Sequence, residues 1–257
     1  MIEFKDVYKT YPNGFTALKG INLQIEQGEF VAIIGLSGAG KSTILRCINR
    51  MHDITKGELT VDGVDVDALK GKTLRRYRRK VGMIFQSFNL VSRSTAIKNV
   101  LTADVPDMNF FRVLFGIFTK DQKMRALESL DKVGILDKAY TRCDQLSGGQ
   151  CQRLVIARAL LRSDSAVYIF DEAASNIDVE SEELIMNVIH ELAKTKTVLL
   201  ISHRLANVVQ SDQIYFLKNG TICERGTHAE LMEQNGAYRH LYDSQMVLEN
   251  YGKQGNA

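Results

Sequence analysis

The segment that most constrains the fold is residues 29–43, EFVAIIGLSGAGKST. A continuous apolar run enters a glycine-rich loop, and the chain leaves that loop through STILRCINRM, a helix-forming stretch. The loop matches the pattern G-x-x-x-x-G-K-[ST], and its position between an apolar strand and a helix is the context that this pattern requires. The sequence therefore predicts a buried parallel strand, a phosphate-binding loop and a helix, in place of a simple glycine turn.

The residue types of this loop suit a nucleotide. Glycines let backbone N–H groups approach phosphates at the positive end of the following helix. Lys41 is expected to reach the β- and γ-phosphates, and the Ser42 hydroxyl to ligate Mg²⁺. The predicted ligands are therefore a nucleoside triphosphate and Mg²⁺. The loop residues predicted to bind the nucleotide are Gly35, Ser37, Gly38, Ala39, Gly40, Lys41, Ser42 and Thr43.

Two further apolar runs end in polar residues, AVYIFDE at 166–172 and TVLLISH at 197–203. Ligand sites on parallel sheets lie at the carboxyl ends of the strands. Asp171 is expected to hold Mg²⁺ through its water shell, and Glu172 to polarise the attacking water. His203 is expected to contact the γ-phosphate. The alternatives are two solvated loop acids and a structural histidine.

Length and composition limit the other possibilities. A chain of 257 residues is long enough for one large α/β domain, or at most two small ones. Its net charge of +3 is too small to indicate a nucleic-acid binder. The four cysteines are scattered, and we interpret them as reduced thiols without a metal site. Since no apolar stretch approaches 18 residues, any membrane role is expected to come through a partner.

Local patterns organise the rest of the chain. The opening alternates apolar and polar residues around a turn at 12–14, which predicts antiparallel strands. Residues 87–162 are mainly helical in pattern. Residues 213–226 predict a hairpin that turns at Asn219-Gly220. A final helical stretch, 227–252, begins with a capping box at Thr227 and Glu230.

A second glycine loop, LSGGQCQR at 146–153, raises the question of why one domain carries two such loops. With it the chain resembles, over its whole length, the nucleotide-binding subunits of ABC transporters, whose signature motif is LSGGQ. The resemblance implies a head-to-tail dimer in which the signature of one copy closes over the ATP of the other. Ser147 and Gly149 would grip the γ-phosphate there, with the dipole of a helix that begins near Gln150. The implied contacts in trans are Ser147, Gly148, Gly149 and Gln150.

The same resemblance assigns the remaining motif residues. Tyr11 would stack on adenine, although it could also be an edge-strand tyrosine. Gln86, in MIFQSFN, would contact Mg²⁺ or the lytic water and sense the permease. Asp178, in SNID, would act across the dimer. The implied catalytic residues are Glu172, His203, Gln86 and Lys41, and the implied metal ligands are Ser42, Gln86 and Asp171. Cys151 and Ala174 depart from the usual residues, and we expect them to modulate at most.

The implied fold is the α/β fold of a P-loop NTPase, specifically the ABC ATPase fold. It has a mostly parallel core sheet, an antiparallel β subdomain and a helical subdomain. We expect a single nucleotide-binding domain over 1–257. Its parts are residues 1–86 (core and antiparallel β part), 87–162 (helical subdomain with the signature) and 163–257 (second part of the core and C-terminal helices).

Two successive parts of the chain resemble two different ABC subfamilies. Residues 1 to about 160 resemble phosphonate-import ATPases, as in SGAGKSTILRCINRM. Residues from about 165 to 257 resemble exporter-type nucleotide-binding domains, as in LLISHRLANV. The hypothesis that follows is a recombinant chain, natural or engineered, joined within 155–168. The expected function is an ATPase subunit that powers import of phosphonate or a related phosphorus compound. The alternatives are an exporter-type domain, a hybrid without its own cargo, or a soluble ABC ATPase acting on DNA or ribosomes.

The expected partners are a second copy of the chain, transmembrane permease subunits and, indirectly, a substrate-binding protein, with no nucleic acid. The expected location is the cytoplasmic face of the cell membrane, without a span of its own.

The apolar cluster FFRVLFGIF at 110–118 is either the small core of the helical subdomain or an exposed patch for the permease. The basic run 70–80 is either a solvated face or a surface that steers nucleotide or meets anionic lipid.

Overall fold

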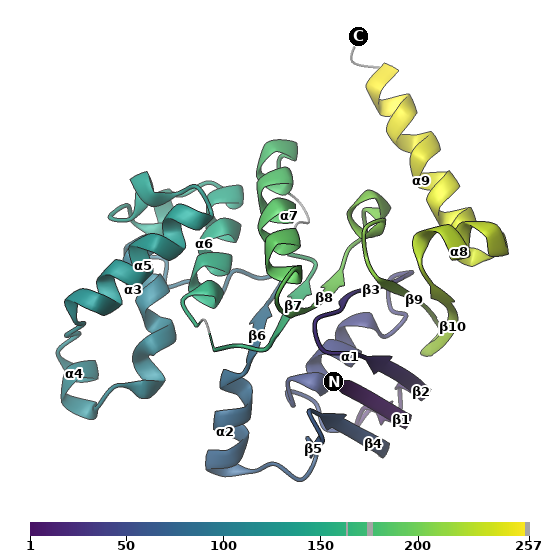
Figure 1. The fold of residues 1–257 in the computed structure, drawn as a ribbon, viewed down its shortest axis with the longest axis horizontal. Coiled ribbons are helices and arrows are strands. Elements are labelled where there is room, and N and C mark those ends of the chain that lie inside the picture. The colour runs from purple at the N-terminus through teal and green to yellow at the C-terminus, as the bar shows by residue number, and fades with distance from the viewer. Residues whose placement is uncertain (163, 174–176, 255–257) are drawn as a thin grey trace. The chain divides into compact units, whose positions relative to one another are not determined.

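Strand β3 (Phe30–Gly35) is the apolar run ahead of the first glycine loop, and all of it is buried. It pairs in parallel with β8 (Thr197–Ile201) and with β9 (Gln213–Lys218), which confirms the predicted buried parallel strands (Figure 1). Strand β10 (Thr221–Gly226) returns antiparallel to β9. The turn residues Asn219 and Gly220 have φ angles of 54° and 84°, as a type I′ hairpin turn requires.

The computed structural model describes residues 1–162, 164–173 and 177–254, without the side chains of 248–254. Its contacts divide the chain into two units. The first unit is Met1–Arg78 together with Thr195–Ala257, and the second unit is Arg79–Lys194. Among the described residues, no helix is long and apolar enough to cross a membrane.

The first unit also holds the antiparallel sheet that the opening alternation predicts. The strands of this sheet are β1 (Ile2–Thr10), β2 (Thr16–Ile25), β4 (Lys56–Val61) and β5 (Val64–Asp65). Their order in the sheet is β2-β1-β4-β5, and the core side includes buried residues such as Ile2 and Phe4. The pairing of β4 with β5 was not predicted. The unit's helices are α1 (Lys41–Ile48), η4 (Leu205–Val208), α8 (His228–Gln234) and α9 (Ala237–Gln254).

The C-terminal helical stretch differs from its prediction. The capping box is confirmed, since Thr227 Oγ1 accepts from the Glu230 backbone N–H at 3.3 Å and Glu230 accepts from that of Thr227 at 2.8 Å. The stretch is two helices, however, because Asn235 ends α8 in the left-handed conformation with φ 54°. The basic run forms helix α2 (Gly71–Arg79), which buries none of its residues, and this exposure fits both interpretations of that run.

The second unit combines two parallel strands with a group of helices, as the helical pattern of 87–162 predicts. Strands β6 (Val81–Ile84) and β7 (Val167–Asp171) pair in parallel, and all of β7 is buried. Helices α3, α5 and α6 contact one another (Figure 1). The helices are α3 (Ala96–Leu101), η1 (Thr102–Asp107), α4 (Phe110–Leu114), α5 (Lys120–Lys132), η2 (Leu136–Lys138), η3 (Cys143–Gln145), α6 (Gly148–Leu160) and α7 (Val179–Ala193).

The apolar cluster 110–118 is not a core, which corrects the first of its two predictions. Phe110, Phe111 and Phe115 expose 72%, 70% and 69% of their surface, and Leu114 exposes 63%. We call residues 109–118 the strap. Helix α4 within it turns its apolar side chains outward and its arginine inward, the reverse of an ordinary amphipathic helix.

Candidate functional site

The first glycine loop is shaped by backbone positions that only glycine fills well. Gly35, at the end of β3, has φ 142°, and a Cβ there would lie 2.1 Å from the carbonyl oxygen of Leu217 on β9. Gly40 has φ 107° and precedes the first residue of α1. Gly38 has φ 77° with open space around its Cβ position. The loop thus leads from a buried strand directly to a helix N-terminus, as a phosphate-binding loop does.

Lys41 closes this loop on itself. Its side chain is only 5% exposed, and Nζ donates hydrogen bonds to the carbonyl oxygens of Gly35 at 2.8 Å and Leu36 at 3.1 Å. A buried ammonium needs such partners because isolated charges are costly to desolvate. Ser42 follows on the first turn of α1 and is partly exposed. The ammonium therefore lies at the loop, where a phosphate could replace the two carbonyl oxygens.

Tyr11 lies beside the helix that follows the loop. Its hydroxyl is 3.2 Å from the hydroxyl of Thr43, which is buried in the first turn of α1. The ring meets the edge of His52 at a centroid distance of 5.4 Å and stacks near Phe15 at 6.5 Å, with Lys9 Nζ 5.3 Å from its centre. The structure brings Tyr11 to the loop, and adenine stacking stays a prediction.

His203 also lies at this edge of the sheet. The β3–β8 register pairs Ile33 with Ile201, so His203 follows β8 at the end where β3 enters the loop. The histidine is exposed, and its carbonyl oxygen accepts a hydrogen bond from Gln245 Nε2 at 2.5 Å. Gln245 Oε1 accepts in turn from the backbone N–H of Leu205 at 3.0 Å. Gln245 on α9 thus holds the segment after β8, a role that the sequence did not predict.

In the second unit, the structure brings Gln86 and Glu172 together. The register of β6 with β7 pairs Ile84 with Phe170, so residues two positions later lie opposite each other. Gln86 Nε2 donates to Glu172 Oε2 at 2.9 Å. Asp171, the last residue of β7, is 4% exposed. Glu172 has φ 56°, a backbone conformation that costs a non-glycine residue about 1–2 kcal/mol, and such strain is concentrated at functional sites.

The signature segment caps its own helix. Ser147 Oγ accepts from the Gln150 backbone N–H at 3.2 Å, and Gln150 Oε1 accepts from that of Ser147 at 3.0 Å. Helix α6 therefore begins at Gly148, two residues before the predicted start near Gln150, because this capping box draws both glycines into the first turn. Ser147 and Gly148 are exposed, and Gly149 is buried.

Asp178 performs the same task for α7. Its Oδ1 accepts from the Ser181 backbone N–H at 2.8 Å, and hydrogen bonds from Ser181, first from the N–H and then from the hydroxyl, lower the pKa of this carboxyl group. The Oδ2 atom lies 3.1 Å from the Cβ position of Gly149. The signature segment and Asp178 are thus adjacent within one chain.

Of the two residues that depart from the family pattern, the structure describes Cys151 but not Ala174. Cys151 is buried, its sulfur lies 3.8 Å from the Cys143 carbonyl oxygen, and burial raises the pKa of its thiol. Ala174 lies outside the described residues, as do Ser175 and Asn176 of the SNID segment.

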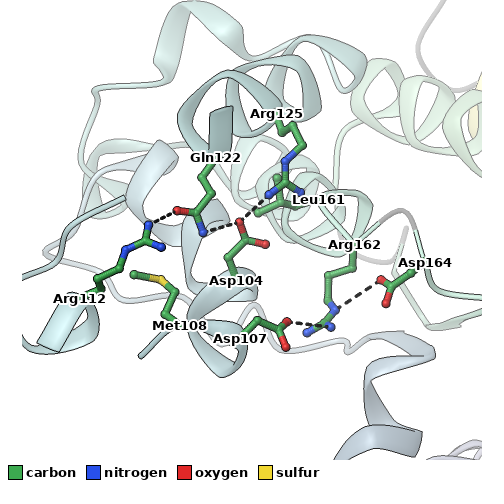
Figure 2. A pocket seen from close by; sticks show the side chains of 9 residues that line it. All are labelled: Asp104, Asp107, Met108, Arg112, Gln122, Arg125, Leu161, Arg162 and Asp164. Atoms are coloured by element: carbon green, nitrogen blue, oxygen red, sulfur yellow. Dashed lines mark hydrogen bonds and ion pairs between the residues drawn. The ribbon is translucent and has the colours of Figure 1, made fainter. Parts of the chain in front are cut away.

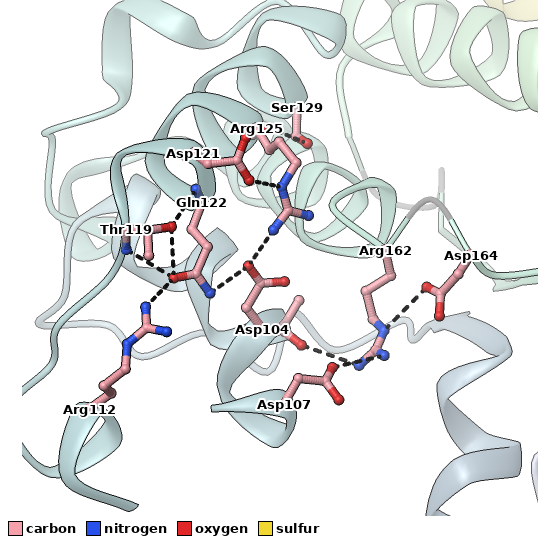
Figure 3. Close-up of polar contacts among 11 residues, drawn as sticks. Asp104, Asp107, Arg112, Thr119, Asp121, Gln122, Arg125, Ser129, Arg162 and Asp164 are labelled. Atoms are coloured by element: carbon pink, nitrogen blue, oxygen red, sulfur yellow. Dashed lines mark hydrogen bonds and ion pairs between the residues drawn. The ribbon is translucent and has the colours of Figure 1, made fainter. Parts of the chain in front are cut away.

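The second unit contains a polar hollow of about 310 Å³ that the sequence did not predict (Figure 2). Gln122 links two charged residues of this hollow, because its Oε1 accepts from Arg112 at 2.7 Å and its Nε2 donates to Asp104 at 3.0 Å (Figure 3). Arg125 also donates to Asp104, at 3.0 Å. The lining residues are Asp104, Asp107, Met108, Arg112, Gln122, Arg125, Leu161, Arg162 and Asp164.

The charged residues of this hollow balance one another. Three arginines face three aspartates, and Arg162 meets Asp107 at 3.4 Å and Asp164 at 3.9 Å. The hollow therefore has no charge excess that would favour an anion or a cation. Its contacts hold the strap instead, because Arg112 also donates to the carbonyl oxygen of Ile117 at 3.2 Å.

Comparisons with known proteins show the family to which this fold belongs. The family model described as "ABC transporter" matches residues 18–175. The "Phosphonates import ATP-binding protein PhnC" of Lactococcus lactis subsp. cremoris (strain SK11) is 50% identical over 237 residues, which cover 91% of this chain and 96% of that protein. A solved dimeric ATP-binding cassette with bound ADP and Pi is 34% identical with a TM-score of 0.80, covering 88% of this chain and 98% of that one.

A third relative is of exporter type. A bacterial Atm1-family ABC exporter with ATP bound has a TM-score of 0.81 and 27% identity, covering 95% of this chain and 41% of that chain. The hypothesis of a recombinant chain gains no support from these comparisons. The Lactococcus alignment covers 91% of the chain, so it extends across 155–168.

These matches confirm the predicted α/β fold of a P-loop NTPase, with the mixed sheets and helices of an ABC ATPase. The family model covers more than half of the chain, and relatives above 40% identity cover nearly all of it. The chain belongs to the ABC transporter family, as an ATP-hydrolysing subunit.

Proposed function

We propose that this chain powers the import of phosphonate or a related phosphorus compound through ATP-driven closure of a dimer. The observation that carries the proposal is the likeness to proteins named as phosphonate importers, at 50% identity over 91% of the chain. The exporter likeness has a comparable TM-score but lower identity, and we keep an exporter-type domain as the second candidate. The permease and the binding protein would recognise the cargo, so the residues of this chain do not identify it. The proposed cargo class is therefore inferred from the relatives alone.

We infer that Mg²⁺ joins ATP in the reaction. The proposed protein ligands are hydroxyl, amide and carboxylate oxygens, from Ser42, Gln86 and Asp171. Mg²⁺ prefers such oxygen ligands and usually binds few of them, together with water and phosphate. Among the described residues no three histidine, cysteine, aspartate or glutamate side chains form a group that could hold a metal ion, which fits an ion held mainly by phosphate and water. When bound, the ion would neutralise charge on the phosphates.

We infer that the other site residues divide the chemistry. Lys41 would exchange its carbonyl partners for the β- and γ-phosphates, and Tyr11 would stack on adenine. Glu172, whose Oε2 accepts a hydrogen bond from Gln86 at 2.9 Å, would polarise the attacking water and accept its proton. His203 would contact the γ-phosphate.

Two chains would build each site. The exposed helix start at Ser147, with Gly148, Gly149 and Gln150, offers backbone N–H groups and a helix dipole to a phosphate. A solved relative of 34% identity is described as dimeric. Asp178 lies beside this segment and would act across the same interface. The dimer would be isologous, so it would contain two equivalent sites.

The partners and the location follow from this role. Transmembrane permease subunits would hold the chain at the cytoplasmic face of the membrane, and a substrate-binding protein would act indirectly. The strap supports this part of the proposal, because exposed apolar patches mark interaction sites. Phe110, Phe111, Leu114 and Phe115 would contact the permease.

The test of the two-chain site is ATPase rate per chain against enzyme concentration, which should rise as dimers form. Ser147→Arg should abolish that rise while ATP still binds to the first loop, because it places a large cation where the phosphate would arrive. Wild-type turnover that is independent of concentration would remove the two-chain site from the proposal.

The test of the chemistry is Glu172→Gln, which keeps the shape of the side chain and removes its basicity. Turnover should fall about 10²–10⁴-fold, the contribution of a positioned general base. ATP should still bind, and a nucleotide-bound dimer should accumulate on size exclusion. Wild-type hydrolysis in this variant would show that another residue is the base.

A further inference from the structure

We propose that Gly149 is a glycine because the chain's own helix α7 occupies the space of a side chain there. In this view Ser181 is a positioning residue that joins the signature segment to Asp178. The inference rests on the proposed function, in which both elements reach the nucleotide of a partner chain. It gives the second signature glycine a role within its own chain.

The geometry at Gly149 leaves no room for a methyl group. A Cβ built on Gly149 would lie 2.3 Å from Ser181 Oγ and 2.7 Å from Ser181 Cβ. Both distances are shorter than any ordinary van der Waals contact. Gly149 and Ser181 are both buried, so neither can turn away into solvent. Gly148, one residue earlier, has open space around its Cβ position. The two adjacent glycines therefore differ in what surrounds them.

The backbone at Gly149 gives no second reason for glycine. The residue lies inside α6, which runs from Gly148 to Leu160, and alanine is the better residue in a helical conformation. Its Cβ position points at α7 of the same chain. Glycine at 149 thus lowers the stability of the helix and gains close packing against Ser181.

Ser181 connects two helix starts through different atoms. Its backbone N–H donates a hydrogen bond to Asp178 Oδ1, the cap of α7. Its side chain fills the space beside Gly149 in the first turn of α6. The Asp178 carboxylate also lies 3.1 Å from the Cβ position of Gly149. Because interiors are close-packed, a shift of one helix start moves the other. The signature segment and Asp178 would therefore approach a partner chain as one body.

The experiment is a double-mutant cycle between Gly149→Ala and Ser181→Gly. In the wild-type background, Gly149→Ala should lower the thermal unfolding midpoint by about 3–10 °C, as overpacking does in a chain of this size. It should also reduce ATPase turnover by about 10–100-fold, since misplacement by about 1 Å has that effect. In the Ser181→Gly background, both clashing atoms are gone and Asp178 keeps its backbone donor. Gly149→Ala should then lower the midpoint and the turnover of that background by much less than in the wild type, because only the contact with Asp178 Oδ2 at 3.1 Å remains.

Two matched variants sharpen the cycle. Ser181→Ala removes Oγ but keeps Cβ at 2.7 Å from the new methyl group, so it should rescue Gly149→Ala only partly. Gly148→Ala meets no neighbouring atom and should leave the unfolding midpoint of the isolated chain equal or slightly higher.

The two readouts separate the reasons for the glycine. Additive midpoints in the cycle would show that the contact with Ser181 does not exist, and the proposal would fall. Rescue of the midpoint without any rescue of turnover would show that the contact serves stability alone, which would overturn the positioning role of Ser181. Failure of the two-chain site is a separate result, seen as a wild-type rate independent of concentration, and the rescue comparison does not depend on it.

Discussion

Replacing Phe115 by alanine distinguishes the two predictions for the apolar cluster 110–118. The side chain is 69% exposed, so folding removes only about a third of it from water. Complete burial of a phenylalanine contributes about 1.5–3 kcal/mol. The buried third therefore contributes about 0.5–1 kcal/mol, and Phe115→Ala should lower the free energy of unfolding by no more than that.

A true core phenylalanine would give a different result, because its removal also leaves a cavity. Phe170→Ala is the matched control in the same unit, since Phe170 on β7 is fully buried. It should lower the free energy of unfolding by about 3–5 kcal/mol. The assay is equilibrium unfolding in urea, with linear extrapolation to water for the wild type and both variants.

The comparison of the two variants is more reliable than either absolute value, since both are measured against the same unfolded chain. A loss of 3 kcal/mol or more in Phe115→Ala would show that the strap folds inward in solution. The argument for an exposed docking surface would then fail, and the cluster would be the small core that composition alone suggests.

Two further predictions test other parts of the first unit. Gln245→Ala should remove both hydrogen bonds that Gln245 makes to the segment from His203 to Leu205, and should lower kcat by up to about 10²-fold with a smaller change in KM for ATP. A steady-state ATPase assay checks this, with Gln245→Glu as the variant of intermediate effect. An unchanged kcat would show that Gln245 has no positioning role. Burial raises the pKa of the Cys47 thiol to about 12, so at pH 8 its thiolate is scarce and shielded. Iodoacetamide should therefore modify exposed Cys223 in the native chain and reach Cys47 only after unfolding, as peptide mass spectrometry would show, whereas early labelling of Cys47 would contradict its burial.

The features that sequence predicted well are those set by near neighbours in the chain. The hairpin at Asn219-Gly220 follows from the turn geometry of two residues, and the capping box at Thr227 and Glu230 spans one helical turn. The strand before the first glycine loop follows from an unbroken apolar run. Each signal lies within a few residues, so no knowledge of the tertiary fold was needed.

The features that sequence missed depend on distant contacts. Gln245 lies 42 residues from His203, and nothing in its local pattern marks it as a partner of that segment. For the strap, the sequence left a small core and an exposed patch both open and could not decide between them. Its orientation is set by Arg112, whose bond to Gln122 turns the polar side of α4 inward. A local pattern shows which residues are apolar, and only the packing decides which way they face.

The strap and the Gly149 contact share a physical principle that bears on how the chain works. In each, a local preference is overruled by a neighbour, since Arg112 faces inward on a short exposed helix and Gly149 occupies a position where alanine would be the better helix former. Lys41 shows the same principle at the first loop, where its ammonium turns back to the carbonyl oxygens of Gly35 and Leu36. Hydrogen bonds from a charged group contribute about 1.5–3 kcal/mol each, so ATP must supply stronger partners before the lysine leaves them. We expect the loop to change little until phosphate arrives, because the chain already satisfies the charge that the phosphate would take over.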